Sequence, residues 1–175
     1  ADALNLGNGG KINIEGIEST RAYGSISARG GLEKGNGGLV QVTGRNYLDI
    51  TNSKINTTAI NGLAGKIFLD SANIFLDKKN IKNNTYNVDN ANIFKPEKNK
   101  TLLDTSTIEK QLRAGNNITI TATNLVEHTG NIKADRLYLK PENNTPAILT
   151  FQADNDISFP VGDIQSINNH LGLVL

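Results

Sequence analysis

Residues 7–44 have the sequence GNGGKINIEGIESTRAYGSISARGGLEKGNGGLVQVTG. In this stretch, short runs in which apolar residues alternate with others are separated by pairs of glycine. Strand side chains point to opposite faces in turn, so residues 12–14 (INI) and 39–42 (LVQV) direct every second side chain inward. The glycine pairs lie where the backbone must turn sharply, because glycine adopts positive φ at little steric cost. This stretch therefore predicts short strands joined by tight turns.

The same pattern continues along the chain and is periodic. Strand starts that follow glycine at Gly10, Gly38 and Gly65 recur about every 27 residues, which lies within the range of solenoid repeats. Strands are predicted at residues 11–14, 25–28, 39–42, 47–50, 55–58, 66–69, 74–76, 118–122, 132, 136–139, 148–151, 157–159, 164 and 171–175. Stacked parallel coils let such short strands pair with the coils above and below, about 4.8 Å away. The sequence thus predicts an all-β chain folded as a parallel β-helix, a solenoid.

A β-sandwich is the alternative arrangement of short strands. Sandwich strands usually have longer alternating runs and hairpin turns of the Asn-Gly type. Asn61-Gly62 is one candidate for such a turn, and one candidate is not enough to favour a sandwich. We therefore expect the solenoid, in which asparagine side chains at the corners hydrogen-bond the turn backbone from coil to coil.

The composition argues against several functional classes. A formal net charge of +1, with acidic and basic residues interspersed, favours neither a nucleic-acid partner nor a polybasic membrane patch. The chain contains no cysteine, which excludes disulfides, thiolate metal sites and thiol chemistry within it. No apolar run approaches the roughly 18 residues of a membrane span, so we expect no direct membrane insertion. Because methionine is also missing, we expect a segment of a longer polypeptide.

The regular pattern is interrupted by one long polar excursion and one short flanking helix. We expect regular coils over residues 1–76, an extra-helical loop over 77–105, the helix over 106–114 and further coils over 115–175, all in one domain. Long loops in compact repeats are often functional, with a solvated spacer as the alternative. The candidate partner-binding residues of this loop are Tyr86, Ile93, Phe94, Lys95 and Lys98.

The short helix is predicted from its capping pattern. Ser106 followed by Glu109 resembles a capping box with Ser106 as the N-cap. Ile108 and Leu112 share one face at i, i+4, and Gly115 ends the helix. We expect this helix to pack on the side of the coils and cover apolar side chains there.

Three segments, in this order, resemble the filamentous-haemagglutinin-type (TpsA-like) exoproteins of two-partner secretion systems. They are GGKINI at residues 9–14, TRAYGSISARGG at 20–31 and GGLVQVTG at 37–44, and GKIFLD at 65–70 fits the next element of the family. The signature positions are Gly10, Arg21, Tyr23, Gly24, Arg29, Gly30, Gly31 and Gly38. The sequence departs from the family pattern at residues 15–16, where an aromatic and a small residue are common, and at Ala22, where Phe is frequent.

The resemblance implies a large, right-handed parallel β-helix that a Gram-negative bacterium exports through a dedicated outer-membrane transporter. It further implies a secreted or cell-surface adhesin whose partner is a host cell surface or a host protein. Two alternatives within the same resemblance are an exoprotein that binds a host haem carrier for iron acquisition and a filament segment of contact-dependent inhibition. No cofactor is expected.

Residues that could carry catalysis are sparse. A polysaccharide-active β-helix enzyme, the least favoured alternative, would need paired carboxylates or a base with arginine on adjacent outward positions. Residues 154–156 (DND) place two carboxylates on one face of an extended segment, but a turn is the ordinary explanation. His128 and His170 lie far apart and belong to no metal-binding motif. We therefore predict no metal site and no enzyme activity.

Two further groups of polar residues have competing interpretations. Arg21 and Arg29 could bind a ligand, but we favour a structural role, such as a pairing of Arg21 with Glu15 or Glu18. Five N-x-S/T sequences begin at Asn56, Asn83, Asn99, Asn117 and Asn143. Glycosylation is one interpretation of these sequences. Stacking of the asparagines at coil corners is the interpretation that we favour.

Overall fold

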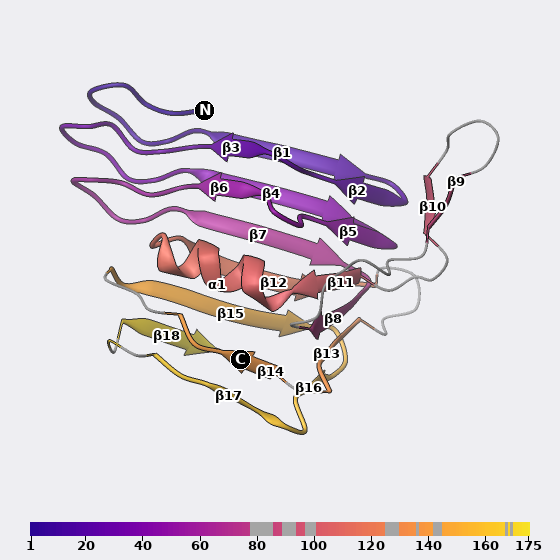
Figure 1. Ribbon diagram of the computed structural model, residues 1–175. Coiled ribbons are helices and arrows are strands. Elements are labelled where there is room, and N and C mark those ends of the chain that lie inside the picture. The colour runs from indigo at the N-terminus through magenta and orange to yellow at the C-terminus, as the bar shows by residue number, and fades with distance from the viewer. Residues whose placement is uncertain are drawn as a thin grey trace.

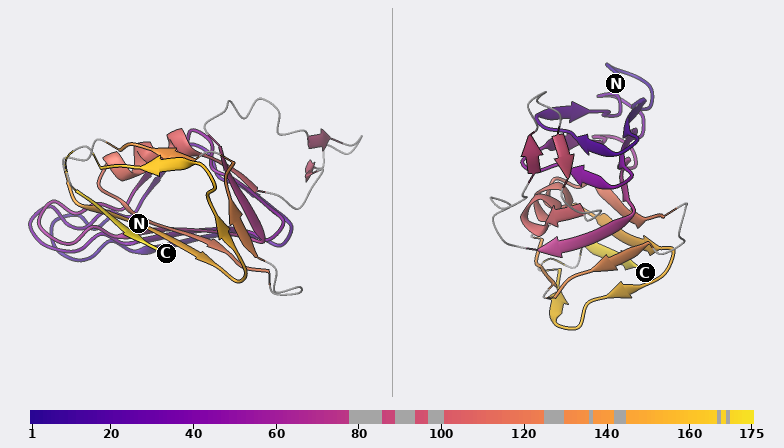
Figure 2. Two further views of the ribbon diagram at one scale, coloured as in Figure 1. Left: turned by 90° about the horizontal axis from the view of Figure 1, so that it is seen from below. Right: turned by 90° about the vertical axis from the view of Figure 1, so that its right-hand side faces the viewer.

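The computed structural model of the 175-residue chain is a stack of coils with three faces (Figure 1). It describes residues 1–77, 101–124, 130–135, 137–141, 145–166, 168 and 170–175, and the backbone of residues 86–88 and 94–96. Seen along the stack, the coils have a triangular outline, from which a column of stacked loops projects on one side (Figure 2, left). The predicted parallel β-helix is confirmed, with about five turns.

The first face is a six-stranded parallel sheet. Its strands, in spatial and sequence order, are β1 (Lys11–Gly16), β4 (Leu39–Gly44), β7 (Lys66–Ser71), β12 (Asn117–Ala122), β15 (Ala147–Ala153) and β18 (Leu171–Val174). Lys11 is paired with Leu39, and Leu39 with Lys66, so the predicted period is the length of one coil. Alternate residues of each strand point inward, which is why Val40 and Val42 are buried while Gln41 is not.

The second face contains two strands that the sequence analysis missed, β2 and β11. Its strands are β2 (Ser19–Arg21), β5 (Tyr47–Asp49), β8 (Asn73–Asp77), β11 (Thr101–Asp104), β13 (Asn131–Lys133) and β16 (Ile157–Ser158). Although β11 follows β8 in sequence, it lies between β8, its parallel partner, and β5. The Thr101 hydroxyl accepts a hydrogen bond from the Leu48 backbone N–H (2.8 Å) and lies 2.6 Å from the Ser71 hydroxyl. These contacts hold β11 in this position.

On the third face, a helix takes the place of a strand. The strands β3 (Ser25–Ser27) and β6 (Lys54–Asn56) form one parallel pair, and β14 (Leu137–Leu139) and β17 (Gly162–Ile164) form another. The helix α1 (Thr105–Arg113) lies between the two pairs and contacts both β6 and β14 (Figure 1). A helix is about 10 Å wide and strands are about 4.8 Å apart, so α1 interrupts the ladder. The helix is therefore part of a coil and not, as predicted, an addition to its side.

Two side chains from the end of the helix satisfy the edge of β6. Asn116 is fully buried; its Nδ2 donates to the Ile55 carbonyl (3.1 Å), and its Oδ1 accepts from the Thr57 backbone N–H (2.8 Å). Gln111 Nε2 donates to the Ser53 carbonyl (2.9 Å). Buried backbone groups without partners are costly, and no strand is available here to supply them. Asn116 and Gln111 thus replace the ladder where the helix breaks it.

The predicted capping box is wrong, although the predicted helix exists. The N-cap is Asp104, whose carboxylate accepts hydrogen bonds from the Ser106 backbone N–H (3.1 Å) and from the Ser106 hydroxyl. An aspartate there also interacts favourably with the positive end of the helix dipole. Glu109 instead accepts a hydrogen bond from the Lys140 N–H (2.8 Å) of a later coil. The predicted end is confirmed, since Gly115 follows the helix with a φ of +83°.

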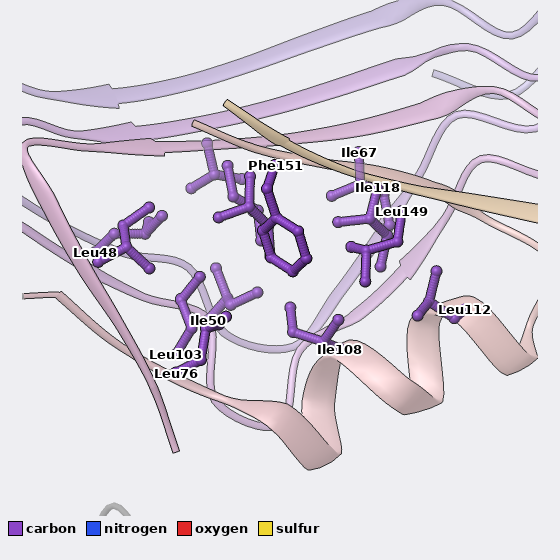
Figure 3. Packing of buried hydrophobic residues seen from close by; sticks show 14 of the residues in the cluster. Leu48, Ile50, Ile67, Leu76, Leu103, Ile108, Leu112, Ile118, Leu149 and Phe151 are labelled. Carbon is purple, nitrogen blue, oxygen red and sulfur yellow. The ribbon is translucent and has the colours of Figure 1, made fainter. Parts of the chain in front are cut away.

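The core fills the inside of the triangle with aliphatic side chains. Figure 3 shows Ile108 and Leu112 of α1 directed toward the same interior as Leu48, Ile67 and Phe151 of the strands. All five side chains are buried. The predicted i, i+4 face of the helix is therefore confirmed as a core face.

The extra-helical loop was predicted too wide, at 77–105. Asp77 ends β8, Thr101–Asp104 forms β11 and Thr105 begins α1, so both ends of the predicted range belong to the coils. We refer to residues 78–100 as the insertion. Within it, β9 (Tyr86–Val88) and β10 (Phe94–Pro96) form an antiparallel pair that belongs to none of the coil sheets.

Candidate functional site

Five large apolar side chains are exposed on the three loops that project from the triangle. Leu4 and Leu6 lie on the first loop, Leu32 on the second, and Ile60 and Leu63 on the third, and each is between 56% and 82% exposed. These loops extend to the left of the strands in Figure 1. We call the five side chains the loop ridge. Apolar side chains gathered at a surface are typical of sites that bind another macromolecule.

Hydrogen bonds between the loops order the ridge. The Leu32 N–H donates to the Leu4 carbonyl (3.0 Å), and the Asn61 side-chain amide donates to the Leu32 carbonyl (2.9 Å). Leu4, Leu32 and Ile60 follow one another at intervals of 28 residues, so they occupy equivalent positions on successive coils. Sequence analysis missed the ridge because the period was applied only to the strands. The same period, extended to the loops, would have found these three residues.

An ion pair closes the base of the first loop. Asp2 accepts hydrogen bonds from the Arg29 backbone N–H (2.7 Å), the Arg29 guanidinium (2.9 and 3.0 Å) and the Ser27 hydroxyl (2.6 Å). Burial disfavours the charged carboxylate, but these hydrogen bonds and the Arg29 charge outweigh it and lower the pKa of Asp2 to about 2. The signature residue Arg29 therefore joins two coils.

Tyr23 and Arg21, two other signature residues, lie beside a buried carboxylate. The Tyr23 hydroxyl donates to Asp49 Oδ2 (2.7 Å), and Asp49 is in register with Arg21 on the neighbouring strand. Burial, together with the hydrogen bond and charge of Asp49, raises the pKa of Tyr23 to about 12, although Arg21 opposes the shift. Tyr23 thus links two coils. The predicted pairing of Arg21 with Glu15 or Glu18 stays a prediction.

The signature glycines allow the coils to stack closely. A Cβ atom on Gly38 would lie 2.1 Å from the Gly10 carbonyl oxygen, which leaves no space for any other residue. A Cβ atom on Gly31 would lie 2.5 Å from the Asn5 carbonyl oxygen of the preceding coil, and one on Gly30 would lie 2.6 Å from the Gly35 carbonyl oxygen of its own loop. Gly24 has a φ of +85°, which favours glycine. These glycines are therefore required by the backbone of the scaffold.

The predicted partner-binding residues lie in the insertion. Tyr86 is on β9, and Phe94 and Lys95 are on β10, so the structure brings these three onto one antiparallel hairpin. Figure 1 shows the hairpin beside the coils. Ile93 and Lys98 lie outside the described residues. Binding by this hairpin stays a prediction.

A groove of about 640 Å³ lies beside the helix that replaces a strand. One wall comes from β3 and β6 and includes Ser25 and Lys54, while α1 contributes Lys110. Within the described part of the chain, neither lysine forms an ion pair. Ser53 also lines the groove; it is 5% exposed, and its hydroxyl has no hydrogen-bond partner there. The groove could therefore attract an anionic ligand.

A smaller hollow of about 220 Å³ at the end of the first face contains acidic residues. It is lined by Glu15, Asp70, Arg45 and Thr123, among others. Burial raises the pKa of Asp70, and the charges of Asp154 and Glu15 add to this effect, against hydrogen bonds with Thr123. Asp70 Oδ1 is buried and has no partner among the described residues. Its carboxyl group therefore loses its proton less readily than an ordinary aspartic acid.

The residues considered for catalysis or metal binding are dispersed. Asp154 Oδ2 accepts a hydrogen bond from the Asn124 backbone N–H (3.0 Å) of the preceding coil. His170 is exposed, and His128 lies outside the described residues. In the described ranges, no three His, Cys, Asp or Glu side chains are gathered in a way that could hold a metal ion. No helix in the described part of the chain is long and apolar enough to span a membrane.

Asparagines stack between coils as predicted. Asn131 Nδ2 donates to Asn73 Oδ1 (3.1 Å), and Asn155 Nδ2 donates to Asn131 Oδ1 (3.0 Å). Asn117, which begins an N-x-S/T sequence, bonds to backbone groups of the coils on both sides, and Asn56 accepts a hydrogen bond from a backbone N–H two residues on. The other N-x-S/T sequences, at Asn83, Asn99 and Asn143, begin outside the described residues.

Comparison with known proteins assigns no family to the chain. Its sequence matches no protein-family model and no curated protein.

Proposed function

We propose that this chain is part of a secreted or surface-exposed adhesin-type exoprotein of a Gram-negative bacterium. The β-helix is the scaffold, and its loops bind a host cell surface or a host protein. Export uses the outer-membrane transporter of a two-partner secretion system. The proposal is supported by the resemblance of residues 9–44 to filamentous-haemagglutinin-type exoproteins and by the parallel β-helix that this resemblance implies.

The loop ridge is the observation that carries the proposal of binding. The interior of the stack already has its own aliphatic core, to which the five ridge side chains do not belong. Burying one Leu or Ile side chain contributes about 1.5–3 kcal/mol. A partner that covers several of them gains enough to offset part of the entropy that association costs, roughly 4–15 kcal/mol. The ridge therefore has the chemistry of an unoccupied protein-binding surface.

Attachment to host cells by the double variant Leu32→Ser with Ile60→Ser tests this surface. Both substitutions remove exposed aliphatic area from adjacent loops, so attachment should fall at least tenfold, or about 1.4 kcal/mol. The matched control is Ile148→Ser with Val161→Ser, which removes exposed aliphatic side chains from other parts of the stack. Attachment of the ridge variant at the wild-type level would overturn the ridge as the binding surface.

A deletion of residues 78–100 tests the insertion separately. The deletion has to spare Thr101–Asp104, because this strand contributes the buried Thr101 and Leu103 to the coils. The coils should stay folded, as measured by circular dichroism, while attachment weakens. Unchanged attachment would leave the loop ridge as the binding surface and remove the insertion from the proposal.

The iron-acquisition alternative has its own test. Immobilised wild-type chain is mixed with serum, and the retained proteins are examined for haem carriers. Retention of a haem carrier, together with no attachment to host cells, would replace adhesion as the function.

A further inference from the structure

Each of the three projecting loops contains one Asn-Gly pair. The pairs are Asn8-Gly9, Asn36-Gly37 and Asn61-Gly62. In such a pair, the glycine nitrogen can attack the asparagine side-chain carbonyl carbon, because glycine has no side chain to hinder the approach. We propose that Asn61 is a site of spontaneous deamidation in the folded protein, whereas the stacking of the coils protects Asn8 and Asn36.

The reaction needs only the chain and water. The Gly62 nitrogen forms a bond to Asn61 Cγ, and the side-chain nitrogen leaves as ammonia, taking up the proton that the Gly62 nitrogen gives up. Water then opens the cyclic imide at either carbonyl carbon. The products are an aspartate or an isoaspartate at position 61, and nothing is oxidised or reduced.

The glycine N–H groups differ between the three pairs. The Gly9 N–H donates to the Asn36 carbonyl (2.8 Å), and the Gly37 N–H donates to the Leu63 carbonyl (2.9 Å). The nitrogen must lose its proton to attack, and a hydrogen-bonded amide in a stable structure loses it slowly, as in hydrogen exchange. The Gly62 N–H has no hydrogen-bond partner among the described residues, and Gly62 is exposed where Gly9 and Gly37 are half-buried.

Each of the three asparagine side chains is exposed and forms one hydrogen bond to a neighbouring loop. Asn8 Oδ1 accepts from the Asn36 backbone N–H (2.8 Å), and Asn36 Oδ1 accepts from the Leu63 backbone N–H (2.9 Å). These bonds tie each side-chain oxygen to a backbone N–H of the next coil. For Asn61, the described contacts include only the bond from Nδ2 to the Leu32 carbonyl, at an exposed position. The difference between the pairs therefore rests on the glycine N–H groups, of which only that of Gly62 has no partner among the described residues.

Deamidation would change the loop ridge. It would place a negative charge between Ile60 and Leu63, and it would replace the donor to the Leu32 carbonyl with an acceptor. The consequence for binding rests on the proposed function: the aged protein should attach more weakly to host cells. The chemical step itself does not depend on that function.

Peptide mapping of the aged protein tests the proposal. The folded chain is incubated in mildly alkaline buffer and then digested with trypsin, which separates the three pairs into the peptides 1–11, 35–45 and 55–66. Mass spectrometry should show deamidation of the 55–66 peptide at least ten times faster than of the other two. In the unfolded chain, all three peptides should react at similar rates. Equal rates in the folded chain would overturn the proposal.

The variant Asn61→Gln assigns the reaction to one residue. The longer side chain forms its ring much more slowly, so the signal in the 55–66 peptide should disappear. A signal that persists would contradict the assignment to Asn61. Gly62→Ala is unsuitable, because its Cβ would lie 2.1 Å from the Gly35 carbonyl oxygen. If Asn61 deamidates but attachment is unaffected, the proposed binding surface is contradicted and the proposed modification is confirmed.

Discussion

Asn116 and Ile60 depart from the usual distribution of residues in opposite directions. The amide of Asn116 is 0% exposed, whereas the aliphatic side chain of Ile60 is 71% exposed. Asn116 has hydrogen-bond partners on Ile55, Thr57 and Gln111. The buried polar residue is therefore explained by the fold alone. Ile60 has no such explanation within the coils, and this difference separates the scaffold from the proposed binding surface.

The largest effect is expected from one substitution made inside and outside the stack. Leu69→Ala removes a fully buried side chain and should lower the free energy of unfolding by about 2–5 kcal/mol. Leu32→Ala removes a ridge side chain and should change this free energy by less than about 0.5 kcal/mol. Urea unfolding followed by circular dichroism measures both. A loss of stability at Leu32 as large as that at Leu69 would show that Leu32 acts as a core residue. The distinction between the scaffold and the loop ridge would then be wrong.

Asn116→Ala tests the buried polar side of the comparison. It leaves the Ile55 carbonyl and the Thr57 N–H without partners, and each orphaned group costs about 1–3 kcal/mol, so we expect a loss of about 3 kcal/mol. Asn117→Ala, the matched control, removes hydrogen bonds that are only partly buried and should cost about 1 kcal/mol. Equal losses in urea unfolding would show that burial of Asn116 is not what makes it important.

Asp70 gives the clearest expected dependence of stability on pH. Its pKa is raised in the folded state, so the folded chain binds more protons than the unfolded chain between the ordinary value of 3.8 and the raised pKa. The stability that Asp70 contributes is present below 3.8 and is lost as the pH rises through the raised pKa. Asp70→Asn should therefore raise the melting temperature at neutral pH and leave it unchanged well below 3.8. A melting temperature that falls at neutral pH would contradict this account.

The pH dependence of stability that Asp2 contributes should be opposite in sign to that of Asp70, and its effect should be small. Its pKa is lowered from 3.8 to about 2, so the stability it contributes is present above 3.8 and is lost as the pH falls through about 2. Because the ion pair with Arg29 is at the surface, Asp2→Asn should cost only about 0.2–1 kcal/mol at neutral pH. Thermal unfolding with and without added salt measures this loss of stability. A loss that salt does not reduce would argue against an ionic origin of the Asp2 contribution.

Local sequence signals predicted the coils, and contacts between distant residues decided the rest. A leading glycine followed by a short run rich in apolar residues located β1, β4 and β7, because this signal is contained in a few adjacent residues. By contrast, β11 depends on the bond between Thr101 and Leu48, and its sequence, TLLD, lies directly after a polar segment. Asn116 likewise has two of its partners, Ile55 and Thr57, far back in the chain, in β6 and just after it.

The candidate site was predictable to a smaller extent. The 28-residue spacing of Leu4, Leu32 and Ile60 is present in the sequence, so the stacking of these ridge residues could have been predicted. The exposure of these residues could not have been predicted, because it depends on how far the loops project from the coils (Figure 2, left). The groove beside α1 was also beyond prediction, since it exists only because the helix replaces a strand.

The central claim is that the scaffold and the binding surface are separable, and one variant tests it most directly. For Leu32→Ser with Ile60→Ser, the free energy of unfolding and the attachment to host cells are measured on the same preparation. We predict a change in unfolding free energy of less than about 1 kcal/mol, from two surface substitutions, and an attachment reduced at least tenfold. A fully stable variant that attaches as well as the wild type would contradict the account.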